Sequence, residues 1–309
     1  MKILIPEYID PRSLQRLRAE HEVVFDSTLW ERRADLVSSA RDAHAIIVRA
    51  RTQVKGELLD AMEYCRAVGR LGVGLDNIDV QTCQARGIEI IPAIGGNARS
   101  VAEYVVTCAL MLLRYSHYSV GGALADGNWI RPAIPEGREV AGRTIGLVGF
   151  GSIGQLTGRL ASRLDMRVVA HDPSLRELPA NDFECQLLPL DDLLASSDIV
   201  SLHLPLTPAT RGLIDASRLA LMQPDAVLVN AARGGIVDEK ALADALAQRR
   251  LRAAALDVFD EEPLPGGTAL SGTPNLLLTP HIAGVTADSE SRVGELVSDR
   301  ILALLKSIA

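Results

Sequence analysis

The chain has 309 residues, 48% of them hydrophobic, and a formal net charge of −7. This length and this apolar content are enough for two domains, each with its own core. The sequence has no basic tract that could neutralise a nucleic-acid backbone, so we expect no nucleic-acid partner. The stretch "VVTCALMLL" spans only half a membrane, and the apolar run at the N-terminus is too short for a signal peptide. We therefore expect a cytoplasmic protein that does not bind membranes.

The four cysteines are far apart in the sequence and form no C-x-x-C pair: Cys65, Cys83, Cys108 and Cys185. This distribution fits a reducing compartment, in which cysteines act as small buried hydrophobic residues. The six histidines are scattered without the spacing of metal ligands. We expect neither a disulfide framework nor a metal site.

The first hundred residues alternate short β-type runs with polar segments that favour helices. The β-type runs are residues 2–6, 21–25, 43–48, 67–72 and 88–92. Such alternation predicts a parallel sheet wrapped by helices.

A long helix is expected from Val101 to Gly127, with Ser100 and Glu103 spaced as in a capping box at its start. Residues 104–113 are apolar on nearly every side of this helix. One domain face would not cover so much apolar surface, so we expect it to pack against a second domain or a second subunit.

A second α/β unit follows, with strand "TIGLVGF", helix "SIGQLTGRLASRL" and further strands in "RVVAHD", "DIVSLHLP", "AVLVNAA", "AAALDVF" and "NLLLTP". This order predicts a doubly wound sheet of six to seven strands. The last segment, residues 289–309, is an amphipathic helix that can return to the first unit. We predict one domain made of residues 1–97 and 284–309, and another made of residues 98–283.

Gly149, Gly151 and Gly154 form the pattern G-x-G-x-x-G between a predicted strand and a predicted helix. In a dinucleotide-binding turn the first glycine permits the tight turn, the second admits the diphosphate and the third allows close helix packing. Methyltransferase loops match the same pattern, so the glycines alone leave both classes open. Asp172 ends the next predicted strand, where it can accept hydrogen bonds from ribose hydroxyls and repel a 2′-phosphate. It can also be a turn aspartate before Pro173.

Arg233, Asp257, Glu262 and His281 each follow a predicted strand of the second unit. The carboxyl ends of parallel strands meet at one edge, so these side chains can converge there. A cation, two carboxylates and an imidazole suit proton and hydride chemistry on an anionic carbonyl compound. Taken one at a time, these residues also have simpler interpretations. Arg233 fits a salt bridge at the start of a helix, Glu262 fits a solvated surface charge, and His281 fits an ordinary histidine at the end of a strand.

The chain resembles the D-isomer-specific 2-hydroxyacid dehydrogenase family over nearly its whole length. The motifs that carry the resemblance stand in order: "GVGLDNID", "SVAEYVV", "GFGSIG", "LHLPLTPATRGLID", "NAARGGIVDEKAL", "ALDVFDEEPL" and "TPHIAG". The resemblance implies two doubly wound parallel-sheet α/β domains, a flavodoxin-like substrate domain and a Rossmann NAD-binding domain. It also implies an NAD-dependent dehydrogenase with catalytic residues Arg233, Glu262 and His281, and a homodimer joined through the helix that "SVAEYVV" opens.

In these roles Arg233 would hold the substrate carboxylate, His281 would exchange the proton, and Glu262 would favour the protonated imidazole. The resemblance places Ser152 and Ile153 at the diphosphate and Asp257 near the nicotinamide. The expected cofactor-binding residues are Gly149, Gly151, Ser152, Ile153, Gly154, Asp172, Leu204, Pro205, Thr210, Ala231, Ala232, Arg233, Asp257, His281 and Gly284.

The first domain offers four candidate substrate residues besides Arg233 of the second. Val73 and Gly74 end a predicted strand with little side-chain bulk, so their N–H groups can reach a carboxylate, although an ordinary tight turn also fits. Arg49 and Arg51 alternate in an extended segment and should point to the same side as an anion clamp, unless they pair with surface carboxylates.

A clamp of this kind implies an anionic group at C3 of the substrate, as in 3-phosphoglycerate or 3-sulfolactate. Hydroxypyruvate and glyoxylate are further possible substrates within the resemblance. An NAD(H)-sensing corepressor-like binding protein on the same fold is the alternative function.

Overall fold

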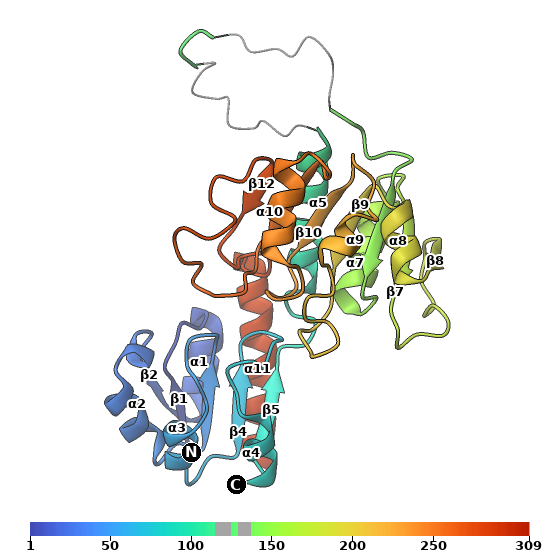
Figure 1. Cartoon of the computed structure of the whole chain (residues 1–309). Helices are drawn as coiled ribbons and strands as arrows, with labels where there is room; N and C mark the ends of the chain where they lie inside the picture. Colours follow the sequence, from blue (N-terminus) through green and yellow to red (C-terminus); the bar gives the residue numbers. More distant parts are fainter. Residues whose placement is uncertain (115–124, 129–136, 309) are drawn as a thin grey trace. The chain divides into compact units, whose positions relative to one another are not determined.

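The structure is a computed structural model that describes residues 1–114, 125–128 and 137–308. The chain divides into two compact units, Met1–Asn97 with Val285–Ala309, and Ala98–Gly284 (Figure 1). We call them unit 1 and unit 2. No helix in the described part of the chain is long and apolar enough to cross a membrane.

Unit 1 contains a parallel five-stranded sheet of strand order β2-β1-β3-β4-β5, which is the flavodoxin-like order. The five expected strands are all present. They are β1 (Lys2–Ile5), β2 (Glu22–Phe25), β3 (Ala45–Val48), β4 (Ala67–Arg70) and β5 (Glu89–Pro92). The helices of this unit are α1 (Pro11–Glu20), α2 (Arg33–Ala40), α3 (Glu57–Ala61), α4 (Val80–Ala85) and α11 (Ala287–Ser307), with a short 3-10 turn η1 (Leu29–Glu31).

Helices cover both faces of this sheet because its central strands are apolar on both sides. Every residue of β3 is buried. One face packs against α1 and α11, and the other against α2, α3 and α4. A side chain at Gly69 of β4 would lie 2.6 Å from Val297 of α11, so the glycine permits close contact. The last helix of the chain therefore packs on the sheet of unit 1, beside β4 and β5 (Figure 1).

Unit 2 contains a parallel seven-stranded sheet of order β12-β11-β10-β9-β6-β7-β8, the doubly wound order of dinucleotide-binding domains. Its strands are β6 (Thr144–Val148), β7 (Arg167–His171), β8 (Cys185–Leu187), β9 (Ile199–Leu202), β10 (Val227–Asn230), β11 (Ala253–Leu256) and β12 (Leu276–Leu278). Its helices are α5 (Ala98–Arg114), α7 (Ser152–Ser162), α8 (Leu190–Ser196), α9 (Ala216–Leu219) and α10 (Glu239–Ala247). The expected fold class is confirmed, with β8 as an edge strand that the sequence patterns did not identify.

Helix α5 corrects one expectation. It begins at Ala98, so Ser100 lies inside the helix and is not its N-cap. Val105, Ala109 and Leu113 are buried in the core of unit 2 itself, with α7, β10 and β11 as neighbours. These side chains therefore have neighbours within unit 2, whereas Leu110 of the same helix is 40% exposed, and packing of the helix against a second subunit stays a prediction. The part of the expected helix at residues 115–124 lies outside the described residues.

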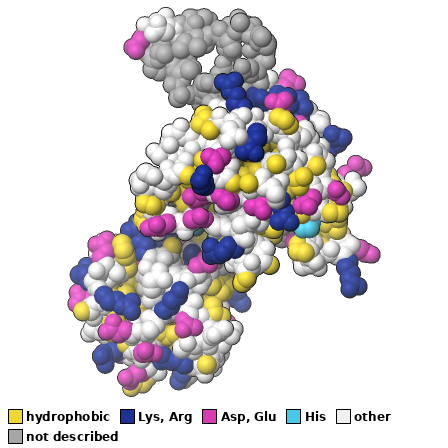
Figure 2. All heavy atoms as spheres, in the orientation of Figure 1, with side chains coloured by type: hydrophobic (Ala, Val, Ile, Leu, Met, Phe, Trp, Pro, Cys, Tyr) yellow, Lys and Arg dark blue, Asp and Glu magenta, His cyan; other side chains and the backbone are white. Residues whose placement is uncertain are grey.

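The charged side chains on the surface bear on the expected partners. On the face drawn in Figure 2, the described Lys and Arg side chains are interspersed with Asp and Glu and form no continuous basic surface.

All four cysteines are free thiols, and Cys65, Cys83 and Cys108 are buried. Burial raises the pKa of Cys65 to about 12 and that of Cys108 to about 11, so both thiols stay protonated.

Candidate active site

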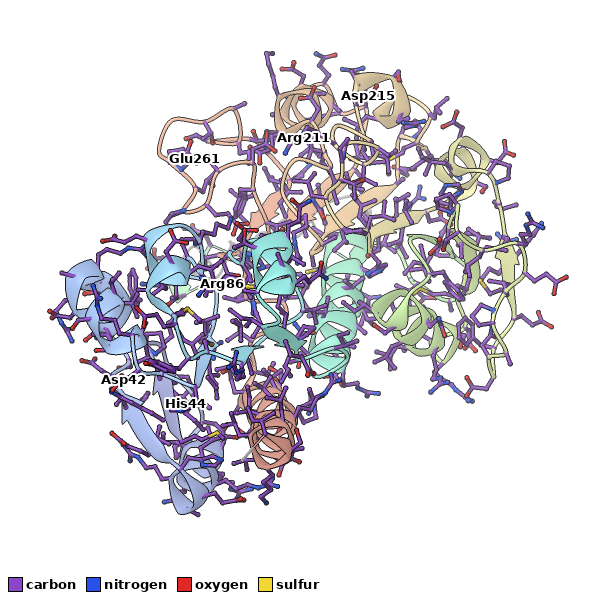
Figure 3. All side chains as sticks on the ribbon, turned by 90° about the horizontal axis from the view of Figure 1, so that it is seen from below. Asp42, His44, Arg86, Arg211, Asp215 and Glu261 are labelled. Atoms are coloured by element: carbon purple, nitrogen blue, oxygen red, sulfur yellow. The ribbon has the colours of Figure 1, made fainter. Side chains whose placement is uncertain are left out.

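Loops at the carboxyl edge of the seven-stranded sheet hold the four residues that the sequence singled out in unit 2. Arg233 follows β10, Asp257 and Glu262 follow β11, and His281 follows β12. These strands are parallel neighbours, so their following loops lie at the same edge. Figure 3 labels Glu261, the residue before Glu262, on this loop.

His281 and Glu262 form a hydrogen-bonded pair. The Nδ1 atom of His281 lies 2.7 Å from Oε2 of Glu262. The other carboxylate oxygen, Oε1, accepts a hydrogen bond of 3.0 Å from the backbone N–H of Phe259, which orients the carboxylate. The His281 side chain is 52% exposed, and in the described part of the chain no hydrogen bond engages its Nε2 atom. The imidazole therefore presents Nε2 outward while Nδ1 stays on a carboxylate, as a proton donor requires.

The carboxylate of Asp257 is buried and is surrounded by donors from the loop that carries His281. Its Oδ1 accepts hydrogen bonds from the Thr279 hydroxyl at 2.6 Å and the Ile282 N–H at 2.8 Å, and its Oδ2 accepts one from the Ala283 N–H at 2.8 Å. The backbone N–H of His281 donates to the carbonyl oxygen of Asp257 at 2.8 Å. Asp257 thus fixes the turn in which His281 adopts a φ of 55°.

The loop that carries Arg233 is held by a side chain that the sequence analysis missed, Asn230 at the end of β10. Its amide donates to the carbonyl oxygen of Arg233 at 3.0 Å, and its Oδ1 accepts from the N–H of Ala232 at 3.1 Å. Asn230 is itself 1% exposed. These two bonds hold the turn, and the Arg233 side chain lies against it, with Nη1 donating to the carbonyl oxygen of Ala232 at 2.6 Å.

Gly234 brings this loop against the loop of Glu262. A Cβ atom at Gly234 would lie 1.7 Å from the carbonyl oxygen of Phe259 and 2.8 Å from the backbone N of Asp260. Only a residue without a side chain permits that approach. The glycine pair after Arg233 was the available signal, since two adjacent glycines in a loop commonly mark a close backbone approach.

The three glycines of the G-x-G-x-x-G pattern differ in their surroundings as a dinucleotide-binding turn requires. Gly149 has φ of 98°, and a Cβ there would lie 2.4 Å from the carbonyl oxygen of His203. A Cβ at Gly154 would lie 2.3 Å from the carbonyl oxygen of Gly149, whereas Gly151 faces open space. The turn is therefore compact at its first and third glycines and open at the second, where a diphosphate would lie against the N-terminus of α7.

Asp172 follows β7 and also supports the glycine turn. Its Oδ2 accepts from the N–H of Phe150 at 3.0 Å, and its Oδ1 accepts from the N–H of Ser174 at 3.0 Å and the Ser174 hydroxyl at 2.6 Å. Partial burial raises the pKa of Asp172, but the hydrogen bonds from Ser174 and Phe150 outweigh it and hold the pKa below its usual value. The carboxylate is ionised at neutral pH, and it is both the turn residue and a negative charge beside the glycine turn.

The loop after β9 closes through its own hydroxyl groups. The Thr210 hydroxyl donates to the carbonyl oxygen of Pro205 at 2.7 Å and accepts from the N–H of Thr207 at 2.8 Å, while Leu204 packs on the core. Burial lowers the pKa of His203 to about 4, so this imidazole is neutral and structural. Ile153 and Ala231 pack on the core, Ala232 is buried, Ser152 is exposed, and Gly284 is the last residue of unit 2.

In unit 1, a buried carboxylate organises the loop after β3. Glu7 is 4% exposed and accepts hydrogen bonds from the N–H groups of Arg49, Arg51 and Thr52, at 2.8, 3.1 and 3.0 Å. The Asn77 amide donates to the carbonyl oxygens of Arg49 and Thr52, at 2.9 and 2.7 Å. The backbone that presents the two arginines is therefore fixed.

The two arginine side chains have different partners. Both terminal nitrogens of Arg49 bind the carboxylate of Glu290 in α11, and its guanidinium lies 5.8 Å from the ring centre of Tyr8. The hydrogen bond to Glu290 raises the pKa of Arg49 above its ordinary value. Arg51 instead lies over Trp30, 4.5 Å from the ring centre. Of the two alternatives stated for these residues, pairing with a carboxylate describes Arg49 in this structure.

Val73 and Gly74 do not end a strand, which corrects that expectation. Strand β4 ends at Arg70, and both residues lie in the loop beyond it, with Val73 exposed. The N–H of Leu71 still bonds to the carbonyl oxygen of Val48 in β3, but the N–H of Gly72 bonds to the carbonyl oxygen of Arg70, which closes a three-residue turn and takes the backbone out of the sheet.

Comparison with known proteins identifies the family. Residues 106–283 match the family model described as "D-isomer specific 2-hydroxyacid dehydrogenase, NAD binding domain". The chain belongs to the D-isomer specific 2-hydroxyacid dehydrogenases. Unit 2 contains the NAD-binding domain of this family.

Two curated relatives and one solved structure extend the match to nearly the whole chain. The chain is 48% identical to the (S)-sulfolactate dehydrogenase of Chromohalobacter salexigens, covering 97% of this chain and 96% of that one. It is 38% identical to the D-3-phosphoglycerate dehydrogenase of Mycobacterium tuberculosis, covering 97% of this chain but 56% of that one. The D-lactate dehydrogenase of Aquifex aeolicus, solved with NAD and lactic acid, superposes with a TM-score of 0.82 at 25% identity over 99% of this chain and 96% of that one.

Substitution of Gly234 by alanine should lower the free energy of unfolding by about 1–3 kcal/mol, because the new Cβ would collide with rigid backbone. Urea unfolding followed by circular dichroism measures the change. Gly266→Ala is the matched control, since Gly266 faces open space with an ordinary φ, and it should leave the stability almost unchanged. Equal stability for the two variants would contradict the close approach of the two loops.

Proposed function

We propose that the chain catalyses reversible hydride transfer between NAD(H) and a small D-2-hydroxy acid or its 2-oxo acid. The observation that carries the proposal is the 2.7 Å pair of His281 and Glu262 at the sheet edge, on loops adjoining that of Arg233. An exposed imidazole held on a carboxylate, with a guanidinium on the next loop, suits proton exchange at an anionic substrate.

In the direction of reduction, the Arg233 guanidinium binds the substrate carboxylate with two N–H groups and polarises the neighbouring carbonyl. His281, protonated, donates the proton at Nε2 to the carbonyl oxygen as the hydride reaches the carbon. In oxidation the neutral imidazole removes that proton from the hydroxyl. Glu262 stabilises the imidazolium through Nδ1 and keeps the ring in position.

Bound NADH supplies the hydride. The turn at Gly149, Gly151 and Gly154 would hold its diphosphate, since among the described residues nothing lies within 4 Å of a Cβ atom at Gly151 and no side chain caps α7. Asp172 would accept a hydrogen bond from the adenosine ribose at Oδ2, because among the described residues this oxygen accepts one bond, from the Phe150 N–H, whereas Oδ1 already accepts two from Ser174.

We further propose that the substrate carries an anionic group at C3, as 3-sulfolactate does. The named activities of the two relatives support this, since sulfolactate and 3-phosphoglycerate both carry an anion at C3. They also share one arrangement at C2: sulfur at C3 outranks the carboxyl carbon in the priority rules, so (S)-sulfolactate has the D arrangement. One active site can therefore treat both as D-2-hydroxy acids.

Arg51 is the residue of unit 1 that we propose as the main ligand of the C3 anion. Its guanidinium stacks on Trp30, and no carboxylate of the described residues pairs with it. A stacked guanidinium keeps the N–H groups in its plane available for a sulfonate or phosphate. Arg49 would contribute more weakly, because it must share its N–H groups with Glu290. A homodimer remains a prediction of the family resemblance, and a cytoplasmic location remains a prediction drawn from the short apolar stretches of the sequence.

Glu262→Gln should move the pH dependence of reduction to lower pH. The amide keeps a hydrogen bond to His281 but not the charge that stabilises the imidazolium, so more acid is needed to keep the proton donor loaded. NADH oxidation from pH 5 to 9 measures the shift. Glu261→Gln, which removes an adjacent exposed charge, should leave the profile in place. An unmoved profile in Glu262→Gln would exclude this acid–base pair.

Asp172→Ala should narrow the preference for NADH over NADPH. The wild-type enzyme should use NADH with a kcat/KM about tenfold or more above that for NADPH, because the carboxylate repels the 2′-phosphate. Steady-state kinetics with both cofactors measures the ratio, and Asp182→Ala serves as a control for loss of a surface carboxylate. A wild-type kcat/KM for NADPH equal to that for NADH would overturn the role of Asp172.

Arg51→Ala should lower kcat/KM for 3-sulfopyruvate by roughly 10- to 100-fold, since a charge-assisted contact is worth about 1.5–3 kcal/mol. The loss with pyruvate should be small, and Arg49→Ala should show a weaker version of the same contrast. Rates of NADH oxidation with the two oxo acids give the comparison. Equal losses for both substrates would mean that the arginines only support the fold. No turnover of any 2-oxo acid by the wild type would favour an NAD(H)-sensing protein.

A further inference from the structure

A chain of hydrogen bonds connects helix α5 to the turn of His281. The hydroxyl oxygen of Tyr104 lies 2.6 Å from Oγ1 of Thr279, and the Thr279 hydroxyl lies 2.6 Å from Oδ1 of Asp257. All three residues belong to unit 2. Thr279 and Ile282 donate to the same oxygen of Asp257, on either side of His281 in the chain.

The direction of these bonds follows from their chemistry. An ionised carboxylate only accepts, so the Thr279 hydroxyl donates to Asp257 and offers its lone pairs to Tyr104. Tyr104 is then the donor to Thr279. Burial raises the pKa of the Tyr104 phenol, so its proton stays in place at neutral pH. Each donor polarises the next, which strengthens the bond that reaches Asp257.

We infer that the Tyr104 hydroxyl is a positioning group for His281, acting through Thr279 and Asp257. The inference rests on the proposed role of His281 as proton donor. Tyr104 fixes the hydroxyl rotor of Thr279, Thr279 and two N–H groups fix Asp257, and Asp257 fixes the left-handed turn at His281. His281 pairs with Glu262 from this turn.

A packing role alone would not use the phenolic oxygen. The ring of Tyr104 packs against the core of unit 2, and phenylalanine would preserve that contact. The buried helix residue Val105 supports the same core without touching the hydrogen-bond chain. The positioning role and the packing role can therefore be separated. Tyr104→Phe removes only the phenolic oxygen, whereas Val105→Ala removes only packing atoms.

The test compares Tyr104→Phe, Thr279→Val and the double variant in NADH-dependent reduction of a 2-oxo acid that the wild type turns over. Each single variant should lower kcat about three- to tenfold, leave the KM for NADH unchanged and move the pH profile of reduction to lower pH, since His281 is held less well on Glu262. The double variant should be no slower than Thr279→Val alone, because both changes break one chain. Thr279→Ser, which keeps the hydroxyl, should retain most of the activity.

Val105→Ala is the matched control: it should lower the melting temperature and keep kcat and the pH profile of the folded enzyme. A wild-type kcat and pH profile in Tyr104→Phe would overturn the inference, as would additive losses in the double variant. Failure of the wider proposal would look different, because His281→Ala would then also keep its activity.

Discussion

The buried carboxylate of Asp257 is the constraint on which the candidate active site depends. An ionised carboxyl group away from water needs several donors, and here the loop after β12 supplies them: one hydroxyl and two backbone N–H groups. Satisfying this charge forces the chain into the turn in which His281 has a positive φ. The imidazole of His281 is then within hydrogen-bond distance of Glu262, which follows Asp257 in the loop after β11. The cost of burying one charge is thus offset by the contacts that shape the site.

The remaining parts of the site are fixed by close backbone approaches at the same sheet edge. Gly234 allows the Arg233 loop to touch the backbone of Phe259, and Gly149 allows the glycine turn to touch that of His203. Because the strands are parallel neighbours in one sheet, the loops that follow them are close in space although they are distant in sequence. His281, Arg233 and the glycine turn, to which we assign the proposed proton-donor, substrate and cofactor roles, therefore lie along one sheet edge, and such an arrangement would support precise chemistry.

Much of this could be predicted from the sequence, and the exceptions have physical reasons. Continuous apolar runs such as "AIIV" identified the buried strands, whereas Cys185–Leu187 is short, lies at an edge and pairs with β7 alone, so its pattern is weak. The spacing of Ser100 and Glu103 resembles a cap but falls inside a helix that starts at Ala98. The pairing of Arg49 with Glu290 joins residues 241 positions apart, and Tyr104 meets Thr279 across 175 positions. Local patterns carry no information about such contacts.

The most direct test of the account follows a labelled hydride through the reaction. NADH carrying deuterium at the transferred position should reduce 3-sulfopyruvate to sulfolactate of the D arrangement with deuterium at C2. His281→Ala should carry out the same transfer about 10²- to 10⁴-fold more slowly, the usual worth of a positioned proton donor. Deuterium at C2 in the opposite configuration, or a His281→Ala enzyme as fast as the wild type, would contradict the mechanism proposed for this site.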